Sequence, residues 1–130
     1  MQGGRKMSIA KSYKELTVYQ KSFDVAMKIF NLSKGFPQDE MYSLTSQIRK
    51  SSRSVSANIA EAYRRRIYPK SFISKLNESE AEATETQNWL DYSFNCGYKG
   101  EEIKDNLYQI YDEILGMLVN MRLSADKWKP

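Results

Sequence analysis

The sequence predicts an all-α protein, an antiparallel up-and-down bundle of four helices. Three observations predict it. Apolar residues recur at steps of three and four along most of the chain. No stretch alternates between apolar and polar residues as a half-buried strand does. Helix-breaking residues fall where the periodic segments end, at Gly35, Pro37, Pro69 and Gly97. Short turns between long helices make consecutive helices antiparallel neighbours.

The first helix is expected over residues 17–34, because its apolar residues alternate steps of four and three, the pattern of a bundle seam. The residues of this seam are Val18, Ser22, Val25, Ile29 and Leu32. Three more residues broaden the same face: Phe23, Ala26 and Phe30. Gly35 is expected to end this helix, and Pro37 prevents its continuation.

The second helix is expected to begin near Asp39 or Ser43 and to end near Arg65, with Asp39 as a candidate N-cap. One apolar edge runs along it: Leu44, Ile48, Val55 and Ile59. Small residues crowd the same segment: Ser51, Ser52, Ser54, Ser56, Ala57, Ala60 and Ala62. A partner helix is therefore expected to approach this segment closely.

The third helix is expected to begin at Pro69, a favoured first-turn residue, and to end before Gly97. The fourth is expected over about 100–127 and carries two apolar stripes. The first stripe is Ile103, Leu107, Ile110, Ile114, Met117 and Met121, and the second is Tyr108, Tyr111, Leu115 and Leu118. Either both stripes are internal or one faces a second subunit, because an exposed apolar stripe on a small domain usually marks an interface.

The composition is that of one small globular domain. The chain has 130 residues, of which 41% are apolar and 28% charged, and this length can bury a real core. Residues 1–12 are expected to be a flexible leader and residues 13–130 the domain. No apolar run approaches the roughly 18 to 20 residues of a membrane span. The lone Cys96 excludes an intramolecular disulfide and fits a cytoplasmic protein.

The sequence lacks the residues of common catalytic centres. It has no histidine, which removes Ser-His and Cys-His nucleophile pairs and the Glu-x-x-His ligands of di-iron bundles. One cysteine cannot supply a four-ligand zinc site. These absences favour a protein that is not an enzyme and that holds no metal or cofactor.

A less favoured alternative is a Mg²⁺-dependent nucleotide pyrophosphohydrolase. Its metal ligands would come from a run of carboxylates on the third helix, Glu78, Glu82 and Glu85, with Glu61 or Asp105 as further ligands. The competing interpretation is that these carboxylates form a solvated face or pair with nearby Lys and Arg side chains.

Four polar residues are expected to form a structural layer: Asn58, Glu61, Ser79 and Thr86. Asn58 and Glu61 lie close to the packed side of the second helix. Ser79 and Thr86 lie where the third helix should face it. Buried polar groups must be hydrogen-bonded, so this layer would fix the helix register, between these helices or at a subunit contact.

Basic residues gather on the second helix and the start of the third, and they form a candidate nucleic-acid-binding patch. Its members are Arg49, Lys50, Arg53, Arg64, Arg65, Arg66, Lys70 and Lys75. Such side chains contact phosphates without reading sequence, and Tyr63 and Tyr68 beside them are candidates for base stacking or for packing. The competing interpretation is that the cations raise solubility and complement the helix dipole.

Several short motifs occur in a fixed order between Leu16 and Leu90. They are Leu16-Thr17-Val18-Tyr19-Gln20-Lys21, Gln47-Ile48-Arg49-Lys50, Asn58-Ile59-Ala60-Glu61-Ala62-Tyr63-Arg64-Arg65, Phe72-Ile73, Lys75-Leu76 and Trp89-Leu90. In this order the chain resembles the family of proteins encoded in intervening sequences of bacterial 23S rRNA genes. It departs from the family pattern at Ala62, where many members have Gly, and at Arg53, where many have an apolar residue.

This resemblance implies a four-helix bundle and a ring-like homo-oligomer, a homopentamer in known members. The accessory variability protein of diversity-generating retroelements is a relative, which implies a partner polymerase or reverse transcriptase. The family has no agreed catalytic residues. We therefore predict a non-enzymatic oligomeric accessory or scaffold protein that binds structured RNA or an RNA/DNA hybrid. The alternative is an oligomeric protein-interaction module that binds no nucleic acid.

Overall fold

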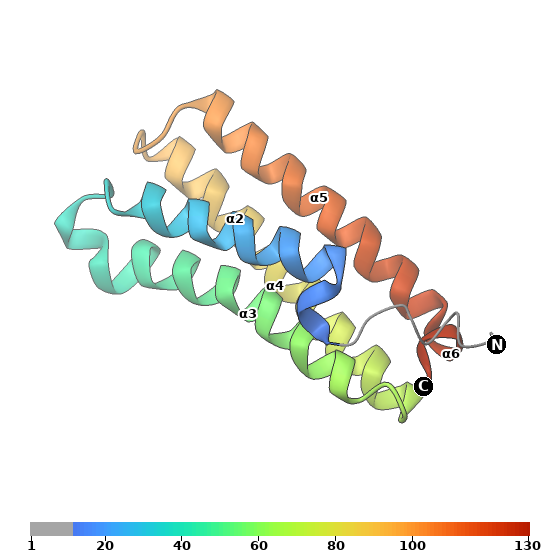
Figure 1. The fold of residues 1–130 in the computed structure, drawn as a ribbon. Coiled ribbons are helices and arrows are strands. Elements are labelled where there is room, and N and C mark those ends of the chain that lie inside the picture. The colour runs from blue at the N-terminus through green and yellow to red at the C-terminus, as the bar shows by residue number, and fades with distance from the viewer. Residues whose placement is uncertain (1–11) are drawn as a thin grey trace.

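The computed structural model describes residues 12–130, and four long helices form most of this part (Figure 1). They are α2 (Thr17–Ser33), α3 (Ser46–Arg64), α4 (Pro69–Asn95) and α5 (Glu101–Leu123). Each runs antiparallel to the next, and α2 and α4 each pack against both α3 and α5. The described residues contain no strand. The predicted all-α class is confirmed, and the four helices surround one core.

Short elements complete the described part of the chain. The 3₁₀ helix η1 (Tyr13–Glu15) precedes α2, and Ser12 caps it by accepting a hydrogen bond from the Lys14 amide. The rest of the predicted leader lies outside the described residues. Between α2 and α3 lie η2 (Gln38–Glu40) and the π-helical η3 (Met41–Thr45), and α6 (Ala125–Trp128) follows α5.

The predicted helix ends agree with the structure except at two places. Pro69 begins α4, and Gly97 follows its end with φ of +79°, a backbone conformation that favours glycine. The start of the second helix differs, because Glu40 rather than Asp39 caps the turn and a π-helical segment precedes α3. The fourth helix breaks at Ser124, and the tail turns so that Trp128 packs on Phe72, with ring centroids 6.5 Å apart.

The core draws on all four long helices. Its fully buried side chains include Ile29 from α2, Ile48 from α3, Phe72 from α4 and Ile114 from α5. Of the residues predicted to broaden the α2 face, Ala26 is buried and Phe30 is half-buried, but Phe23 is exposed.

Both apolar stripes predicted for α5 contribute to the core, although neither stripe is buried along its whole length. The buried residues of α5 come alternately from each stripe: Leu107, Tyr111, Ile114, Leu118 and Met121. A straight helix repeats every 3.6 residues, so the line between the stripes faces the core and their outer members lie at its edges. Ile103 is exposed, and Ile110 and Met117 are half-buried.

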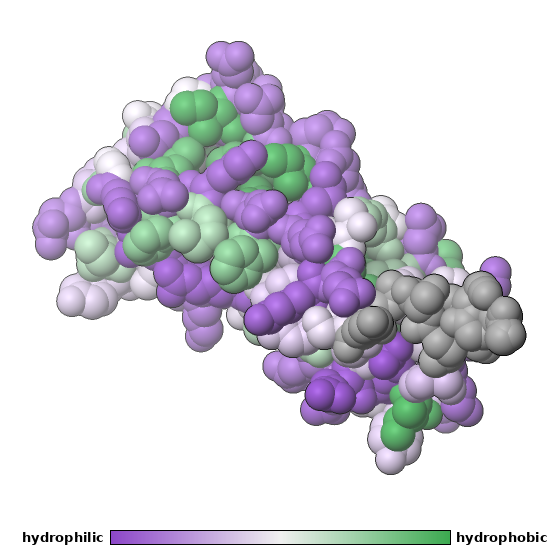
Figure 2. Space-filling model, viewed as in Figure 1, coloured by the Kyte–Doolittle hydropathy of each residue, from purple (hydrophilic) through white to green (hydrophobic). Residues whose placement is uncertain are grey.

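Apolar side chains also reach the surface. On the face drawn in Figure 2 they gather over α2 and the first half of α5, with polar side chains between them. Phe23, Met27 and Ile103 are each close to half exposed. None of the helices in the described part of the chain is both long and apolar enough to cross a membrane.

Candidate nucleic-acid interface

The inner side of α3 holds it against α4 through small polar side chains. The Ser79 hydroxyl donates to the Val55 carbonyl oxygen at 2.8 Å, and the Thr86 hydroxyl bonds the Ser51 hydroxyl at 2.8 Å. All of these side chains are buried, so each bond satisfies polar groups that water cannot reach. Small residues here bring the two helices close together and fix the position of α3.

Asn58 and Glu61 lie outside this buried layer in the single chain, which corrects the placement of both between α3 and α4. Asn58 is half-buried and donates to the Ser54 carbonyl oxygen of its own helix at 2.9 Å. Glu61 is exposed and pairs with Lys75 at 2.9 Å. The reason is angular: at 3.6 residues per turn, Asn58 lies about 60° and Glu61 about 120° around the α3 axis from Val55, whose carbonyl oxygen accepts the bond from Ser79. A role for them at a subunit contact stays a prediction.

The pair with Glu61 also changes the assignment of Lys75. Its ammonium group contacts Glu61 at 2.9 Å and Glu78 at 3.4 Å, and its side chain is largely covered. The hydrogen bond that Lys75 donates to Glu61 and the two negative charges raise the pKa of Lys75, although burial partly opposes this. Two carboxylates therefore pair with the Lys75 ammonium group. Lys75 links α4 to α3 and is not free to bind a phosphate.

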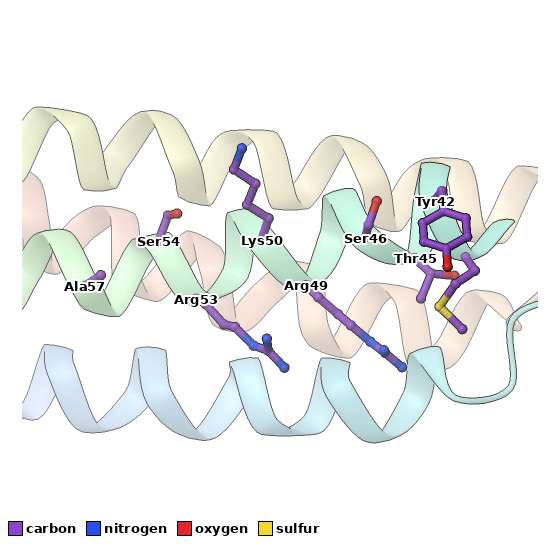
Figure 3. A pocket seen from close by; sticks show the side chains of 9 residues that line it. Tyr42, Thr45, Ser46, Arg49, Lys50, Arg53, Ser54 and Ala57 are labelled. Atoms are coloured by element: carbon purple, nitrogen blue, oxygen red, sulfur yellow. The ribbon is translucent and has the colours of Figure 1, made fainter.

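The outer side of α3 carries a groove of about 530 Å³, called the α3 groove here. Figure 3 shows Arg49 and Arg53 extending from α3 toward α2, whereas Lys50 extends toward α4. Small residues form the floor between these walls, and Tyr42 lies at one end. The lining residues are Met41, Tyr42, Thr45, Ser46, Arg49, Lys50, Arg53, Ser54 and Ala57. The groove exists because no long side chain fills the floor.

The wall toward α2 is built on one aromatic ring, that of Phe30. Arg49 lies 4.9 Å, Arg53 5.6 Å and Lys34 4.7 Å from its centroid. Arg49 also donates from Nε to the Ser33 hydroxyl at 2.7 Å. Cation–π contacts of this kind hold positive groups in place without neutralising them. The sequence patterns did not identify Lys34, Phe30 or Ser33 as parts of the site, because their role depends on α2 and α3 packing side by side.

A second group of cations lies at the turn between α3 and α4. Arg66 stacks on Tyr63, 3.8 Å from the ring centroid, and donates to the Tyr63 carbonyl oxygen at 2.7 Å. Arg65 donates to the Ser71 hydroxyl at 3.2 Å. Arg64 and Lys70 are exposed. Arg66 therefore braces the turn, whereas Arg64, Arg65 and Lys70 present their charge to solvent.

The predicted patch is thus two clusters, one along the outer side of α3 and one at the turn between α3 and α4. Arg53, Lys50 and Arg64 lie within about 60° of one another around the helix axis at 3.6 residues per turn. Arg53 and Arg64 are separated by roughly 16 Å along the axis, about the rise of five base pairs. Within residues 12–130 no ion pair joins these three cations to a carboxylate. Of the two tyrosines beside the arginines, Tyr63 is buried and Tyr68 is exposed.

Several of the carboxylates considered as Mg²⁺ ligands have other partners. Glu85 accepts a hydrogen bond from Trp89 Nε1 at 3.0 Å, and Asp105 pairs with Lys104 at 2.7 Å. Burial and the neighbouring Glu85 raise the pKa of Glu82, and Lys50 partly offsets this rise. Among the described residues no three acidic or cysteine side chains are grouped as a metal site requires.

Comparisons with known proteins agree with the fold. No protein of curated function matches the chain. The chain resembles the crystal structure of a protein of unknown function from the S23 ribosomal protein family of Bacteroides thetaiotaomicron, with 30% identity and a TM-score of 0.75 over 82% of this chain and 96% of that chain. Residues 14–120 match the family model described as 23S rRNA-intervening sequence protein. Because this match spans most of the chain, the protein belongs to the 23S rRNA-intervening sequence protein family.

Proposed function

We propose that this protein is a nucleic-acid-binding scaffold that contacts phosphates through the outer side of α3. The observation that supports this most is the lack of ion-pair partners for Lys50, Arg53 and Arg64 among the described residues, although carboxylates neutralise Lys75 and Arg122. Cations aligned on one exposed side of a helix suit a phosphate backbone, which offers a regular row of negative charge. The family description refers to 23S rRNA, so structured RNA is the first ligand to test.

The proposal includes assembly into a homo-oligomer. Phe23, Met27 and Ile103 leave apolar surface on α2 and α5, and burial of such surface is a common basis of subunit contacts. The part of this contact on α5 is diagonal to α3 in the bundle, whereas the part on α2 lies on a direct neighbour of α3. Several copies of a small cationic patch in one assembly bind a long polyanion together, which raises the overall affinity by roughly 10² to 10⁴.

A second candidate function is an interaction module for another protein, including a polymerase or reverse transcriptase. The same apolar residues, Phe23, Met27 and Ile103, favour it. This function needs no phosphate contact, so it predicts that removal of the α3 cations leaves binding of the partner unchanged. It also predicts weak salt dependence, because an apolar contact is not screened by ions.

The test compares two charge reversals of equal size. The first variant, Arg53→Glu/Arg64→Glu, changes the exposed side of α3. The control, Lys127→Glu/Lys129→Glu, makes the same change of charge at exposed positions in the C-terminal tail. Fluorescence anisotropy would measure binding of a labelled RNA hairpin and a duplex DNA by each protein between 50 and 300 mM KCl, roughly the range over which phosphate contacts weaken strongly.

Phosphate binding by α3 predicts that the first variant loses affinity and that its salt slope falls by about 2, since each lost contact on a duplex contributes about 0.9. The control should keep most of its affinity. Equal losses in both variants would show that only net charge matters. No binding by the wild type at about 50 mM KCl, the salt concentration of the series at which phosphate contacts are strongest, would refute the proposal and leave the protein-interaction module as the better explanation.

A further inference from the structure

Tyr42 is the most exposed large side chain of an apolar or aromatic type in the described chain, with 94% of its surface accessible. It lies in the π-helical segment η3, and such segments often occur at functional sites. An aromatic ring of this size normally covers apolar surface or meets a partner. The position of Tyr42 therefore needs an explanation that packing of the single chain does not supply.

The turn beneath Tyr42 is braced. The Glu40 carboxylate accepts hydrogen bonds from the Ser43 hydroxyl at 2.5 Å and from the Leu44 amide at 3.3 Å. The Tyr98 hydroxyl, from the turn between α4 and α5, donates to the same carboxylate at 2.7 Å. Three bonds from two parts of the chain hold the backbone of η3 in place. Tyr42 is consequently presented on a fixed support.

Tyr42 stands between two grooves of opposite character. On one side lies the α3 groove with its cationic walls. On the other lies a groove of about 710 Å³ between η3 and the last turns of α4, called the aromatic groove here, to which Trp89 and Tyr92 contribute their rings. These rings lie 5.7 Å apart, and Tyr92 is about half exposed. Gln47 adds an exposed amide to the same groove.

The charges on the two sides differ in a way that orients a ligand. Glu40 lines the aromatic groove, and Glu85 accepts a hydrogen bond from Trp89, so negative charge disfavours phosphate there. Arg49, Lys50 and Arg53 favour phosphate on the other side. Aromatic rings bind the faces of nucleobases, and cations beside them bind the backbone. An internal base pair of a duplex has both faces covered by its neighbours, so along the strand only an unpaired base can stack on Tyr42.

We propose that Tyr42 binds an unpaired nucleotide, whose base lies against Tyr42 in the aromatic groove and whose phosphates lie between the cationic walls of the α3 groove. This rests on the proposed function and adds a ligand class to it: single strands, and loops or bulges of structured RNA. The α3 cations contact either paired or unpaired strands, and Tyr42 distinguishes between them. The competing outcome of the test is that Tyr42 contacts a protein.

The experiment uses the full chain with two labelled RNA probes of equal length, an unstructured 12-mer and its duplex, at one fixed salt concentration. Three variants are compared with the wild type: Tyr42→Ala, Tyr42→Phe and, as a matched control, Tyr68→Ala. Tyr68 is also an exposed tyrosine and lies at the opposite end of α3, beside Arg64 and Arg65. Because Tyr42 is almost fully exposed, its replacement removes little packing.

The proposal predicts that Tyr42→Ala weakens binding of the single strand by about fivefold or more, the lower range for loss of one base-stacking ring. Binding of the duplex should change by less than about twofold, which is within ordinary surface effects. Tyr42→Phe, which keeps a ring, should behave like the wild type, and Tyr68→Ala should not weaken binding of the single strand more than binding of the duplex.

Four results would overturn the inference: no loss with Tyr42→Ala, an equal loss on both probes, an equal selective loss with Tyr68→Ala, or a changed sedimentation coefficient of Tyr42→Ala, which would place Tyr42 in a protein contact. If the wild type binds the duplex but the variants show no selectivity, the inference fails and the proposed function stands. If the wild type binds neither probe, both fail.

Discussion

The hydroxyl of Tyr111 is buried in the core without a hydrogen-bond partner, and its removal is predicted to stabilise the protein. Tyr111 lies on α5, is fully buried, and its hydroxyl oxygen bonds to no described group. Burial raises the pKa of Tyr111, and the nearby Thr86 hydroxyl only partly offsets this. A buried donor without a partner costs about 1–3 kcal/mol. Tyr111→Phe keeps the ring, so we expect the free energy of unfolding to rise by about 1 kcal/mol.

Urea denaturation followed by circular dichroism would measure this change, at one protein concentration because assembly would add to the apparent stability. A gain of about 1 kcal/mol corresponds to roughly 4 °C in melting temperature for a chain of this length. The control is Tyr68→Phe, which removes the same hydroxyl from an exposed ring and should shift the free energy of unfolding by less than about 0.5 kcal/mol.

A loss of about 1 kcal/mol or more in Tyr111→Phe, the worth of a typical hydrogen bond, would refute the reasoning, because the hydroxyl would then have a partner in solution. Thr86 is the nearest candidate for that partner. A double-mutant cycle with Thr86→Val would decide whether the two hydroxyls interact: additive effects exclude the bond, and coupling reveals it.

Three further predictions follow from contacts of α3 and its neighbours. Ser79→Ala should lower the free energy of unfolding by about 1 kcal/mol in the same urea assay, because it removes a buried bond to α3. Glu61→Gln should leave the melting temperature unchanged, because the pair with Lys75 is largely exposed on the Glu61 side; a marked decrease would place Glu61 in a subunit contact. Hydrogen bonds from Ser43 and Tyr98 lower the pKa of Glu40 below its usual 4.5. Their contribution to the free energy of unfolding is therefore present above pH 4.5 and declines as the pH falls through the lowered pKa. The melting temperature of Glu40→Gln should therefore lie below that of the wild type at pH 7 and approach it in acid.

Local signals in the sequence predicted most of the fold. Pro69 and Gly97 mark the ends of α4 because their backbone preferences act within a single turn. Val18, Ser22, Val25 and Ile29 are buried as the seam pattern predicts, since helix periodicity alone decides which side of an amphipathic helix faces the core. The small residues Ser79 and Thr86 likewise lie at the α3–α4 contact, where the spacing of residues on α4 predicts them.

The features that sequence patterns could not predict depend on partners distant in the chain. The π-helical η3 is stabilised by Glu40, which Tyr98 contacts across 58 positions. Arg49 is oriented by Ser33, 16 positions earlier, on a different helix. Glu61 is the same residue type as Glu40, which caps a turn, and only the angle of Glu61 around α3 and the nearness of Lys75 make it a surface ion-pair partner. Residue type therefore indicates which groups carry charge, and packing determines which of them are free.

The composition of α3 connects its structural and proposed functional roles. Small residues on its inner side, such as Ser51, let α4 approach until buried hydroxyls bond across the contact. Small residues on its outer side, Ser54 and Ala57, leave the floor of the α3 groove empty between Arg53 and Lys50. A large residue on the inner side would separate the helices, whereas one on the outer side would fill the groove and leave the core intact. Ala57→Leu therefore separates the two roles: it should retain the stability of the bundle and obstruct phosphate binding, and loss of both together would mean that the outer side of α3 is itself packed in the assembly.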